Sequence, residues 1–202
     1  MAANRHNPET RDRIVEAALS LFADRGFDGT TTRQVAARAG VNLGLIQYYF
    51  GSKEKLWKDS VDRAFARLRT DLSDTIPDTP RDADQVAELI HVVTRFAARN
   101  AAFVRLMNDE GKRRGPRMRW FVDRHQRPLF EAITGVLAAA RARGLVIDAE
   151  PTHLYYALLG AVTMIFALAP ECRRLTGADP TADDAMVRAH AETVTRMLVA
   201  RR

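Results

Sequence analysis

Apolar residues recur at intervals of three and four positions through most of this 202-residue chain, and this spacing limits its fold more than any other feature. Near the start they stand at Ile14, Ala17, Ala18, Leu21 and Phe22, which is the pattern of one apolar helix face. Strand signals are nearly absent, because no stretch sustains the alternation of polar and apolar residues that strands show. The sequence therefore predicts an all-α protein of about nine helices.

The composition narrows the class of protein further. Hydrophobic residues make up 47% of the chain and charged residues 28%, which is typical of a soluble globular protein. The single cysteine, Cys172, excludes an intramolecular disulfide and supplies no metal-ligand set. The first residues, MAANRHNPETRDR, have no apolar core, so no secretory signal is expected. We expect a cytoplasmic protein without a metal or cofactor, and the net charge of +6 favours an acidic partner such as nucleic acid.

The stretch from Leu154 to Ala169 contains no charged residue. It is shorter than the roughly 20 residues that a membrane-spanning helix needs, and Pro170 and Glu171 follow it directly. A helix that is apolar on all sides must be covered on all sides. We therefore expect a central helix or a subunit interface here, and no contact with a membrane.

Start and stop signals divide the N-terminal part of the chain into three helices. Thr31 and Gln34 form the reciprocal capping pattern at the start of the second helix, and Gly40 ends it. Asn42 can cap the third helix, which Gly51 ends. We place the domain boundary at this point, with a small domain at 1–51 and a larger helical bundle at 52–202.

The turn between the second and third helices has the spacing of a helix-turn-helix. Ala36 is small enough to let two helices cross closely, and Gly40 accepts the positive φ of a tight turn. Ile46 can anchor the third helix on the second. All three requirements, with caps at both helix starts, are met together, so the pattern predicts a helix-turn-helix.

The third helix has one face without a partner in its own domain. At about 100° per residue, Ile46 and Phe50 form the buried face, while Gly44 and Tyr48 lie opposite. Gly44 costs about 1 kcal/mol inside a helix, so its best use is to let a partner approach the backbone. The alternative is ordinary surface scatter. We favour a helix that enters the major groove of DNA, where this face meets base edges and phosphates.

The segment TTRQVAARAGVNLGLIQYYFGSKEKLW resembles the DNA-binding signature of the tetracycline-repressor (TetR) family of bacterial transcriptional regulators. The resemblance implies a homodimer, a ligand-binding bundle, and release from an inverted-repeat operator on double-stranded DNA when a small-molecule effector binds. By position it implies phosphate contacts at Thr31, Thr32, Tyr48 and Lys53, and base contacts at Arg33, Leu43, Gly44, Leu45 and Gln47. Asn42 and Tyr49 complete the predicted DNA-binding set.

Two positions depart from the pattern of that family. Gln47 stands where a tyrosine is frequent, and Leu43 stands where a polar residue or lysine often lies. These departures leave the operator sequence open. The choice between repressor and activator is open as well, although repression is commoner in the family that the chain resembles.

The larger bundle holds aromatic and methionine side chains that could line a cavity for an apolar ligand, although such residues at helical spacing are more often ordinary core. The predicted ligand-contact set is Phe65, Phe96, Phe103, Met107, Trp120, Phe121, Tyr155 and Met164. No catalytic motif appears. A repressor that a mainly apolar ligand releases from its operator is therefore the favoured function, and the alternative is an all-α enzyme or carrier of a hydrophobic small molecule.

A basic run, GKRRGPRMRWFVDRHQR, covers residues 111–127. Its simplest interpretation is a solvated loop and helix start. Contact with DNA phosphates and capture of an acidic ligand are the sharper alternatives, and spacing alone does not separate them.

The last two predicted helices, at about 151–169 and 181–199, have the character of a subunit interface. The first is apolar around most of its circumference, and the second carries an apolar stripe. We predict a two-fold four-helix bundle between two copies of the chain. The predicted interface residues are Ala157, Gly160, Ala161, Met164, Val187, His190, Val194, Met197 and Leu198.

Overall fold

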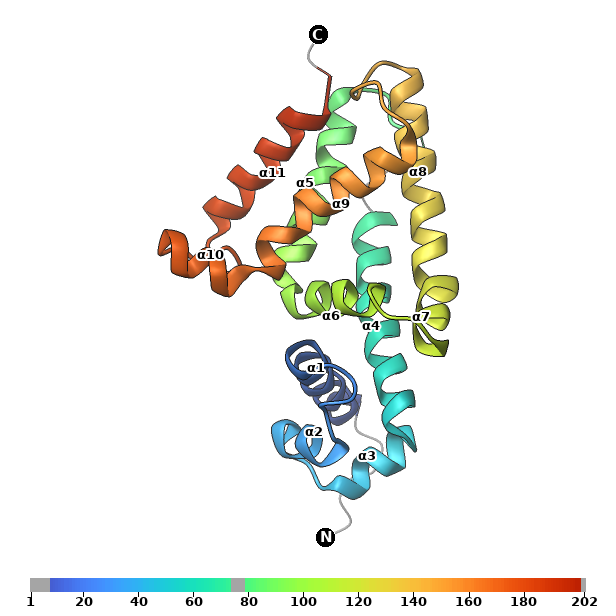
Figure 1. Cartoon of the computed structure of the whole chain (residues 1–202), viewed down its shortest axis with the longest axis vertical. Helices are drawn as coiled ribbons and strands as arrows, with labels where there is room; N and C mark the ends of the chain where they lie inside the picture. Colours follow the sequence, from blue (N-terminus) through green and yellow to red (C-terminus); the bar gives the residue numbers. More distant parts are fainter. Residues whose placement is uncertain (1–7, 74–78, 201–202) are drawn as a thin grey trace.

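The computed structural model describes residues 8–73 and 79–200, and in this part of the chain the secondary structure consists of helices joined by short connections (Figure 1). It contains eleven α-helices and one π-helical turn. The residues described form no β-strand, and Val146 and Val199 make one isolated bridge. The predicted all-α class is confirmed.

The first three helices form the small domain at the lower end of Figure 1. They are α1 (Pro8–Arg25), α2 (Thr32–Ala39) and α3 (Leu43–Phe50). The capping box at the start of α2 is present, because Thr31 and Gln34 bond each other's backbone N–H groups. These starts and stops agree with the sequence prediction.

Helix α4 (Lys53–Ser73) runs from the small domain into the larger bundle (Figure 1). Its first half belongs to the same hydrophobic core as α1, with Leu56, Trp57 and Val61 fully buried there. This core also takes in Phe103 of the bundle. Packing is therefore continuous across the predicted boundary between residues 51 and 52, and α4 links the two domains mechanically.

The bundle begins with α5 (Ala83–Arg99) and α6 (Ala101–Gly111), which lies across the top of the small domain and contacts α1. Next come α7 (Pro116–Phe121), a π-helical turn (Val122–Gln126) and α8 (Arg127–Ala142). Together these last three are one long helix with an irregular turn.

The irregular turn does not lie where the sequence alone would place it. A proline inside a helical segment commonly kinks the helix, and Pro128 lies within the segment that begins at Pro116. Instead, the irregularity is the π-helical turn immediately before it, and Pro128 lies in the first turn of α8, where a missing N–H needs no helical partner. A π-turn widens the backbone spiral by one residue and is common at functional sites.

The chain ends with α9 (Pro151–Ala167), α10 (Ala169–Thr176) and α11 (Asp184–Leu198). Helix α10 was not predicted, because Pro170 follows the apolar run and was taken only as its end. Proline is accepted in the first turn of a helix, so Pro170 begins α10. Counted with α7 to α8 as one bent helix, α10 is the addition to the predicted nine.

Helix α9 is the central helix that its charge-free sequence predicts. It contacts α5, α6, α8, α10 and α11, and Val162 and Phe166 have no exposed surface. Within the described residues, no single helix is long and apolar enough to cross a membrane. Helices α9 and α10 meet the length and composition criteria only as a pair, and that pair is bent by 68°.

Candidate nucleic-acid interface and ligand cavity

The turn between α2 and α3 has the geometry of a helix-turn-helix. Gly40 adopts a left-handed conformation with φ 64°, and the Val41 N–H donates to the Ala36 carbonyl at 3.0 Å. Ala36 is 4% exposed and Ile46 2% exposed, so both lie at the contact of the two helices. The three predicted roles of Ala36, Gly40 and Ile46 are confirmed.

Helix α3 presents a solvent-facing surface opposite its buried face. Ile46 and Phe50 are buried, whereas Leu43 is 42% exposed and Tyr48 51% exposed. Gln47 is also exposed. Exposed apolar and aromatic side chains that gather on one face of a short helix form a candidate binding surface.

The remaining predicted contact positions surround this face. Asn42 and Gly44 are exposed on α3, Thr31 and Arg33 are exposed at the start of α2, and Thr32 is half-buried. Leu45 and Tyr49 are half-buried and pack against the first hydrophobic core. The predicted DNA-binding residues before Lys53 therefore lie together around α2 and α3, with Thr32, Leu45 and Tyr49 only half-exposed.

Gly44 has a local role besides any partner. The Asn42 side chain accepts the Gly44 N–H at 2.7 Å and caps α3. A β-carbon on residue 44 would lie 3.2 Å from that same side-chain oxygen, which is tighter than ordinary contact. The capping geometry thus gives a second reason for glycine here, in addition to the approach of a partner.

Lys53 has a different role from the predicted phosphate contact. Its ammonium donates to the carbonyls of Phe27 and Thr30, both at 3.0 Å, and lies 4.3 Å from the centroid of the Phe27 ring. The side chain ties the start of α4 to the loop between α1 and α2. Because this ammonium already has three intramolecular contacts, the phosphate contact at Lys53 stays a prediction.

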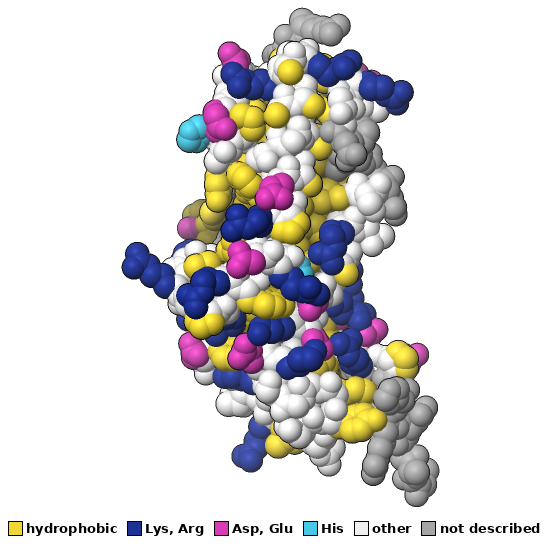
Figure 2. All heavy atoms as spheres, turned by 90° about the vertical axis from the view of Figure 1, so that its right-hand side faces the viewer, with side chains coloured by type: hydrophobic (Ala, Val, Ile, Leu, Met, Phe, Trp, Pro, Cys, Tyr) yellow, Lys and Arg dark blue, Asp and Glu magenta, His cyan; other side chains and the backbone are white. Residues whose placement is uncertain are grey.

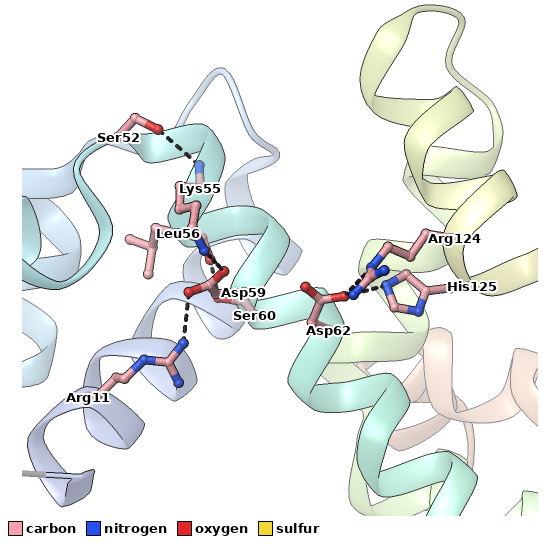
Figure 3. Close-up of polar contacts among 9 residues, drawn as sticks. All are labelled: Arg11, Ser52, Lys55, Leu56, Asp59, Ser60, Asp62, Arg124 and His125. Carbon is pink, nitrogen blue, oxygen red and sulfur yellow. Dashed lines mark hydrogen bonds and ion pairs between the residues drawn. The ribbon is translucent and has the colours of Figure 1, made fainter.

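Helix α4 carries two carboxylates one turn apart (Figure 3). One contacts the small domain and the other contacts the bundle. Asp59 is 9% exposed and accepts from Arg11 of α1 at 2.8 Å and from Lys55 at 2.5 Å. Asp62 lies 3.1 Å from Arg124 and 2.9 Å from Nε2 of His125, both in the π-helical turn. One helix is thereby fixed by charge to the small domain and to the bundle.

The basic run is largely bound to the chain itself. Arg113 is paired with Asp28 of the small domain at 3.5 Å, and Lys112 with Asp109 at 3.2 Å. The Nε of Arg117 lies 3.0 Å from both carboxylate oxygens of Glu110. Arg124 reaches Asp62, as described above. Two of these pairs, Arg113–Asp28 and Arg124–Asp62, join the bundle to the small domain and to α4, a role that the sequence analysis did not include.

The bundle holds a partly open cavity of about 110 Å³ between α4, α5, α6, the π-helical turn, α8 and α9. Its lining includes five members of the predicted ligand-contact set: Phe65, Phe96, Phe103, Met107 and Tyr155. Burial raises the pKa of Tyr155 to about 12, with Tyr156 adding to the effect, so its hydroxyl stays protonated at neutral pH. The cavity is mainly apolar, as predicted.

Three members of the predicted ligand-contact set do not line this cavity. Trp120 packs edge-on against Trp57 at 5.6 Å, and Phe121 is 1% exposed beside Phe65, so both are core residues outside the cavity. Met164 is 48% exposed and faces away from it. Sequence periodicity does not separate a residue that fills a core from one that borders a void.

The sequence analysis missed the polar part of the lining, which consists of Asn108, Gln126 and Thr163. Thr163 donates to the Leu159 carbonyl at 2.6 Å, as a buried hydroxyl in a helix commonly does. Asn108 and Gln126 are polar residues on otherwise amphipathic helices, and only the fold shows that they face inward. No local signal distinguishes them from surface amides.

Much of the predicted interface stripe on α11 packs inside its own chain. Val187, Val194 and Leu198 are 6%, 1% and 9% exposed and pack within their own chain, where α11 contacts α5. The Nε2 of His190 lies 2.8 Å from the Ala161 carbonyl, which joins α11 to α9. These residues hold the bundle together within one chain.

The solvent-facing sides of α9 and α11 carry other apolar groups. Ala157 and Met164 are exposed and Gly160 is half-buried on α9, and Met197 is 61% exposed on α11. Tyr156, which is 63% exposed, was not in the predicted set. Within the described residues, no group of three or more His, Cys, Asp and Glu side chains could hold a metal ion.

Comparison with known proteins agrees with this arrangement over both parts of the chain. Residues 14–59 match the bacterial regulatory proteins of the tetR family, and residues 83–197 match the tetracyclin repressor-like C-terminal domain. The chain belongs to the TetR family. The predicted class, a helix-turn-helix regulator of transcription, is therefore confirmed at the level of the family, whose matches here are to transcriptional regulators.

Individual members of the TetR family are similar to this chain in sequence or in structure. The HTH-type transcriptional repressor NicS of Pseudomonas putida is 34% identical over 150 residues, which are 69% of this chain and 66% of NicS. The repressor SCO4008 of Streptomyces coelicolor is 28% identical over 173 residues, 84% of each chain. The structure of AibR in complex with isovaleryl coenzyme A and operator DNA has a TM-score of 0.74 at 16% identity, covering 93% of this chain and 97% of AibR, and shows a shared fold.

Proposed function

We propose that this TetR-family regulator is a homodimeric repressor of the cytoplasm. In this proposal α3 of each copy enters the major groove of an inverted-repeat operator, and a small, mainly apolar effector that binds in the bundle releases the protein. The observation that carries the proposal is the solvent-facing surface of α3, where Leu43 and Tyr48 are exposed while Ile46 and Phe50 fix the helix from behind. A rigid helix with an exposed face is suited to reading base edges.

The relatives support the two halves of this proposal. NicS and SCO4008 are named as transcriptional repressors. AibR, which shares the fold, is described in complex with both isovaleryl coenzyme A and operator DNA. The cavity of about 110 Å³ in the bundle gives an effector a place to bind here.

Release of DNA requires that the effector prefer the conformation that does not fit the operator, because equal affinity for both conformations shifts nothing. Helix α4 is suited to carry this preference. Phe65 on its second half lines the cavity, and Asp59 on its first half holds Arg11 of the small domain. A ligand that moves Phe65 therefore displaces the helix that positions α3.

Selection from a randomised duplex library with the full chain, followed by footprinting, tests the DNA half of the proposal. We expect inverted half-sites whose centres are about 34–36 Å apart, or wider if the duplex is distorted. Gln47→Ala should change which bases are preferred, whereas Tyr48→Phe should weaken all sites alike. The absence of any duplex bound above background would end the proposal.

Substitution of Lys53 tests which side chains contact the DNA phosphates. Because its ammonium is bound to two carbonyls, Lys53→Met should leave the salt dependence of operator affinity unchanged while lowering the melting temperature. Arg33→Gln, on the exposed start of α2, is the matched comparison and should reduce the slope by about one if it meets a phosphate. If Lys53→Met reduced the salt dependence of operator affinity, Lys53 would be a phosphate contact in the DNA complex.

A further inference from the structure

A second hollow lies on the surface next to the inner cavity. It has a volume of about 310 Å³ and runs between α4 and α8. Figure 2 looks onto this side of the molecule, where hydrophobic side chains line a recess in the upper half and Lys and Arg side chains gather below it. The residues that border both this cleft and the inner cavity are Phe65, Leu68, Leu72, Leu129 and Ile133.

One layer of side chains therefore separates the cleft from the cavity. Leu72 and Leu129 in this layer are only half-buried. Leucine side chains near a surface change rotamer on a timescale far shorter than that of binding. An elongated apolar molecule can pass between these two leucines and occupy both spaces.

The two spaces differ in charge. Among the residues that the structure describes, none that lines the inner cavity is charged, so an ionic group there would be desolvated without compensation. The cleft, in contrast, is lined by Arg69 and His125, and no carboxylate is among its described lining residues. Asp62, the nearest acid to His125, is already paired with Arg124 and with the His125 ring.

His125 is an unusual lining residue for a surface cleft. It is 3% exposed, and its ring stacks on Phe65 at 4.4 Å with an interplanar angle of 8°. Neither ring nitrogen makes a hydrogen bond of ordinary geometry with the described residues, although Nε2 lies 2.9 Å from Asp62. Buried polar atoms are nearly always bonded, so an unpartnered one at the edge of a cavity marks a position for a ligand or water. Its place in a π-helical turn agrees with this.

We propose that the effector is a small monocarboxylate with an elongated apolar body, whose carboxylate lies in the cleft at Arg69 and His125 and whose body passes between Leu72 and Leu129 into the inner cavity. This inference rests on the proposed function, since it names the chemistry of the effector. Arginine pairs with a carboxylate through two parallel hydrogen bonds. One fixed cation balances a monoanion, whereas a phosphate would leave charge uncompensated.

The carboxylate position also explains how binding reaches the DNA-binding domain. His125 contacts Asp62, and Asp62 lies one turn along α4 from Asp59, which holds Arg11 (Figure 3). The neutral ring carries one N–H, so a carboxylate that accepts it at Nδ1 leaves Nε2 with no proton to donate to Asp62. The ligand therefore alters the polar contacts of α4 at the point where this helix leaves the bundle.

Three probes of equal length and different charge test the inference: octanoate, 1-octanol and octylamine. Binding to the full-length protein is measured by calorimetry at neutral pH, and by tryptophan fluorescence, because Trp120 packs 5.3 Å from His125. Octanoate should bind at least tenfold more tightly than 1-octanol, and octylamine most weakly. Arg69→Gln should weaken octanoate about tenfold and leave 1-octanol unchanged, because only the charged hydrogen bonds are lost.

Arg99→Gln is the matched control, since Arg99 is also an exposed arginine but borders neither space. It should leave the affinities for all three probes unchanged. Equal affinity for octanoate and 1-octanol, equal weakening of both by Arg69→Gln, or no octanoate binding at millimolar concentration would each overturn the inference.

Operator release is measured separately with the same probes. If octanoate binds through Arg69 but the operator complex stays intact, the inference stands and the proposed function fails. If an uncharged probe releases the operator equally from the wild-type protein and from Arg69→Gln, the proposed function stands and the inference fails.

Discussion

The guanidinium carbon of Arg117 lies 4.2 Å from the centroid of the Phe27 ring, which also receives the Lys53 ammonium at 4.3 Å. Arg117 belongs to α7, Phe27 follows α1, and Lys53 begins α4. One aromatic ring thus joins three elements where the bundle meets the DNA-binding domain. Arg117 is at the same time the partner of Glu110, which is only 3% exposed.

This junction predicts a large stability effect for one arginine of the basic run. Arg117→Ala leaves a buried Glu110 without its cation, and breaking a buried pair in this way costs about 3–5 kcal/mol. Urea unfolding of the full chain measures the loss. Arg114→Ala, which removes an exposed arginine of the same run, should change the free energy of unfolding by no more than about 0.5 kcal/mol.

A double substitution separates the buried charge from the cation–π contact. Glu110→Gln combined with Arg117→Ala should cost less than the sum of the two single changes, because the uncompensated carboxylate is gone. Additive costs, or equal effects of Arg117→Ala and Arg114→Ala, would show that the pair does not hold the junction.

Gly44→Ala should separate DNA binding from stability. Alanine gains up to about 1 kcal/mol of helix propensity, but its methyl group would lie 3.2 Å from the Asn42 oxygen that caps α3, so the two effects oppose each other. On the proposed DNA-facing surface the same methyl group blocks close approach of the backbone. We expect at least a tenfold loss of operator affinity with a nearly unchanged melting temperature.

Gly135→Ala is the comparison for Gly44→Ala. Gly135 lies within α8, is exposed, and has open space where a β-carbon would stand. It should raise the stability by about 0.5–1 kcal/mol and leave operator affinity unchanged. Equal operator affinity of Gly44→Ala and the wild-type protein would remove the argument that the backbone of α3 approaches DNA.

The parts of the structure that the sequence predicts are those that local chemistry decides. The capping box of Thr31 and Gln34 and the left-handed Gly40 involve residues within a few positions of each other, and all are present. The buried face of α3 likewise follows from helical geometry, because only one side of a short helix can face its domain. Local rules therefore located the helix-turn-helix without tertiary information.

The errors concern residues whose role depends on distant parts of the chain. The Lys53 ammonium donates to the carbonyls of Phe27 and Thr30, which lie more than 20 residues earlier in the chain. The sequence around Lys53 does not reveal this contact. Similarly, an apolar stripe on α11 does not reveal whether it packs on α5 or on a second copy. For this reason the sequence did not show that Val194 is buried within its own chain or that Trp120 lies outside the cavity.

His125 should make the stability of the protein depend on pH. Burial lowers the pKa of His125 below its ordinary value of 6.5, with Arg69 and Arg124 acting in the same direction and Asp62 opposing them. The unfolded chain therefore binds a proton at a higher pH than the folded chain does. The neutral ring contributes stability that is fully present above about pH 6.5 and is lost as the pH falls through the folded pKa.

Urea midpoints at pH 7.5 and pH 5.5 measure this dependence. The wild-type protein should lose more stability over this interval than His125→Gln does, because the variant lacks the titrating ring. His153→Gln, on the exposed side of α9, controls for the removal of a histidine. A steeper loss for His125→Gln than for the wild-type protein would mean that Asp62 outweighs burial and that the ring is charged when folded.

The dimer prediction now depends on which residues of α9 and α11 face outward. Met164 on α9 is 48% exposed, whereas Val194 on α11 is 1% exposed inside its own chain. Met164→Glu should therefore give folded monomers, since a charge in a two-fold interface faces its own copy. Val194→Glu should instead unfold the chain, because it buries a charge without a partner.

Sedimentation velocity and circular dichroism distinguish these outcomes. Leu175→Glu is the control, because Leu175 is 77% exposed on α10 and should tolerate a charge without loss of the dimer. Monomers of Met164→Glu should bind an isolated half-site but lose the tight binding to an inverted repeat, since two linked reading helices bind far more tightly than one. If Met164→Glu stayed dimeric while Val194→Glu gave folded monomers, the interface would include the inner stripe of α11, and that helix would have to turn or separate from α5 when two copies assemble.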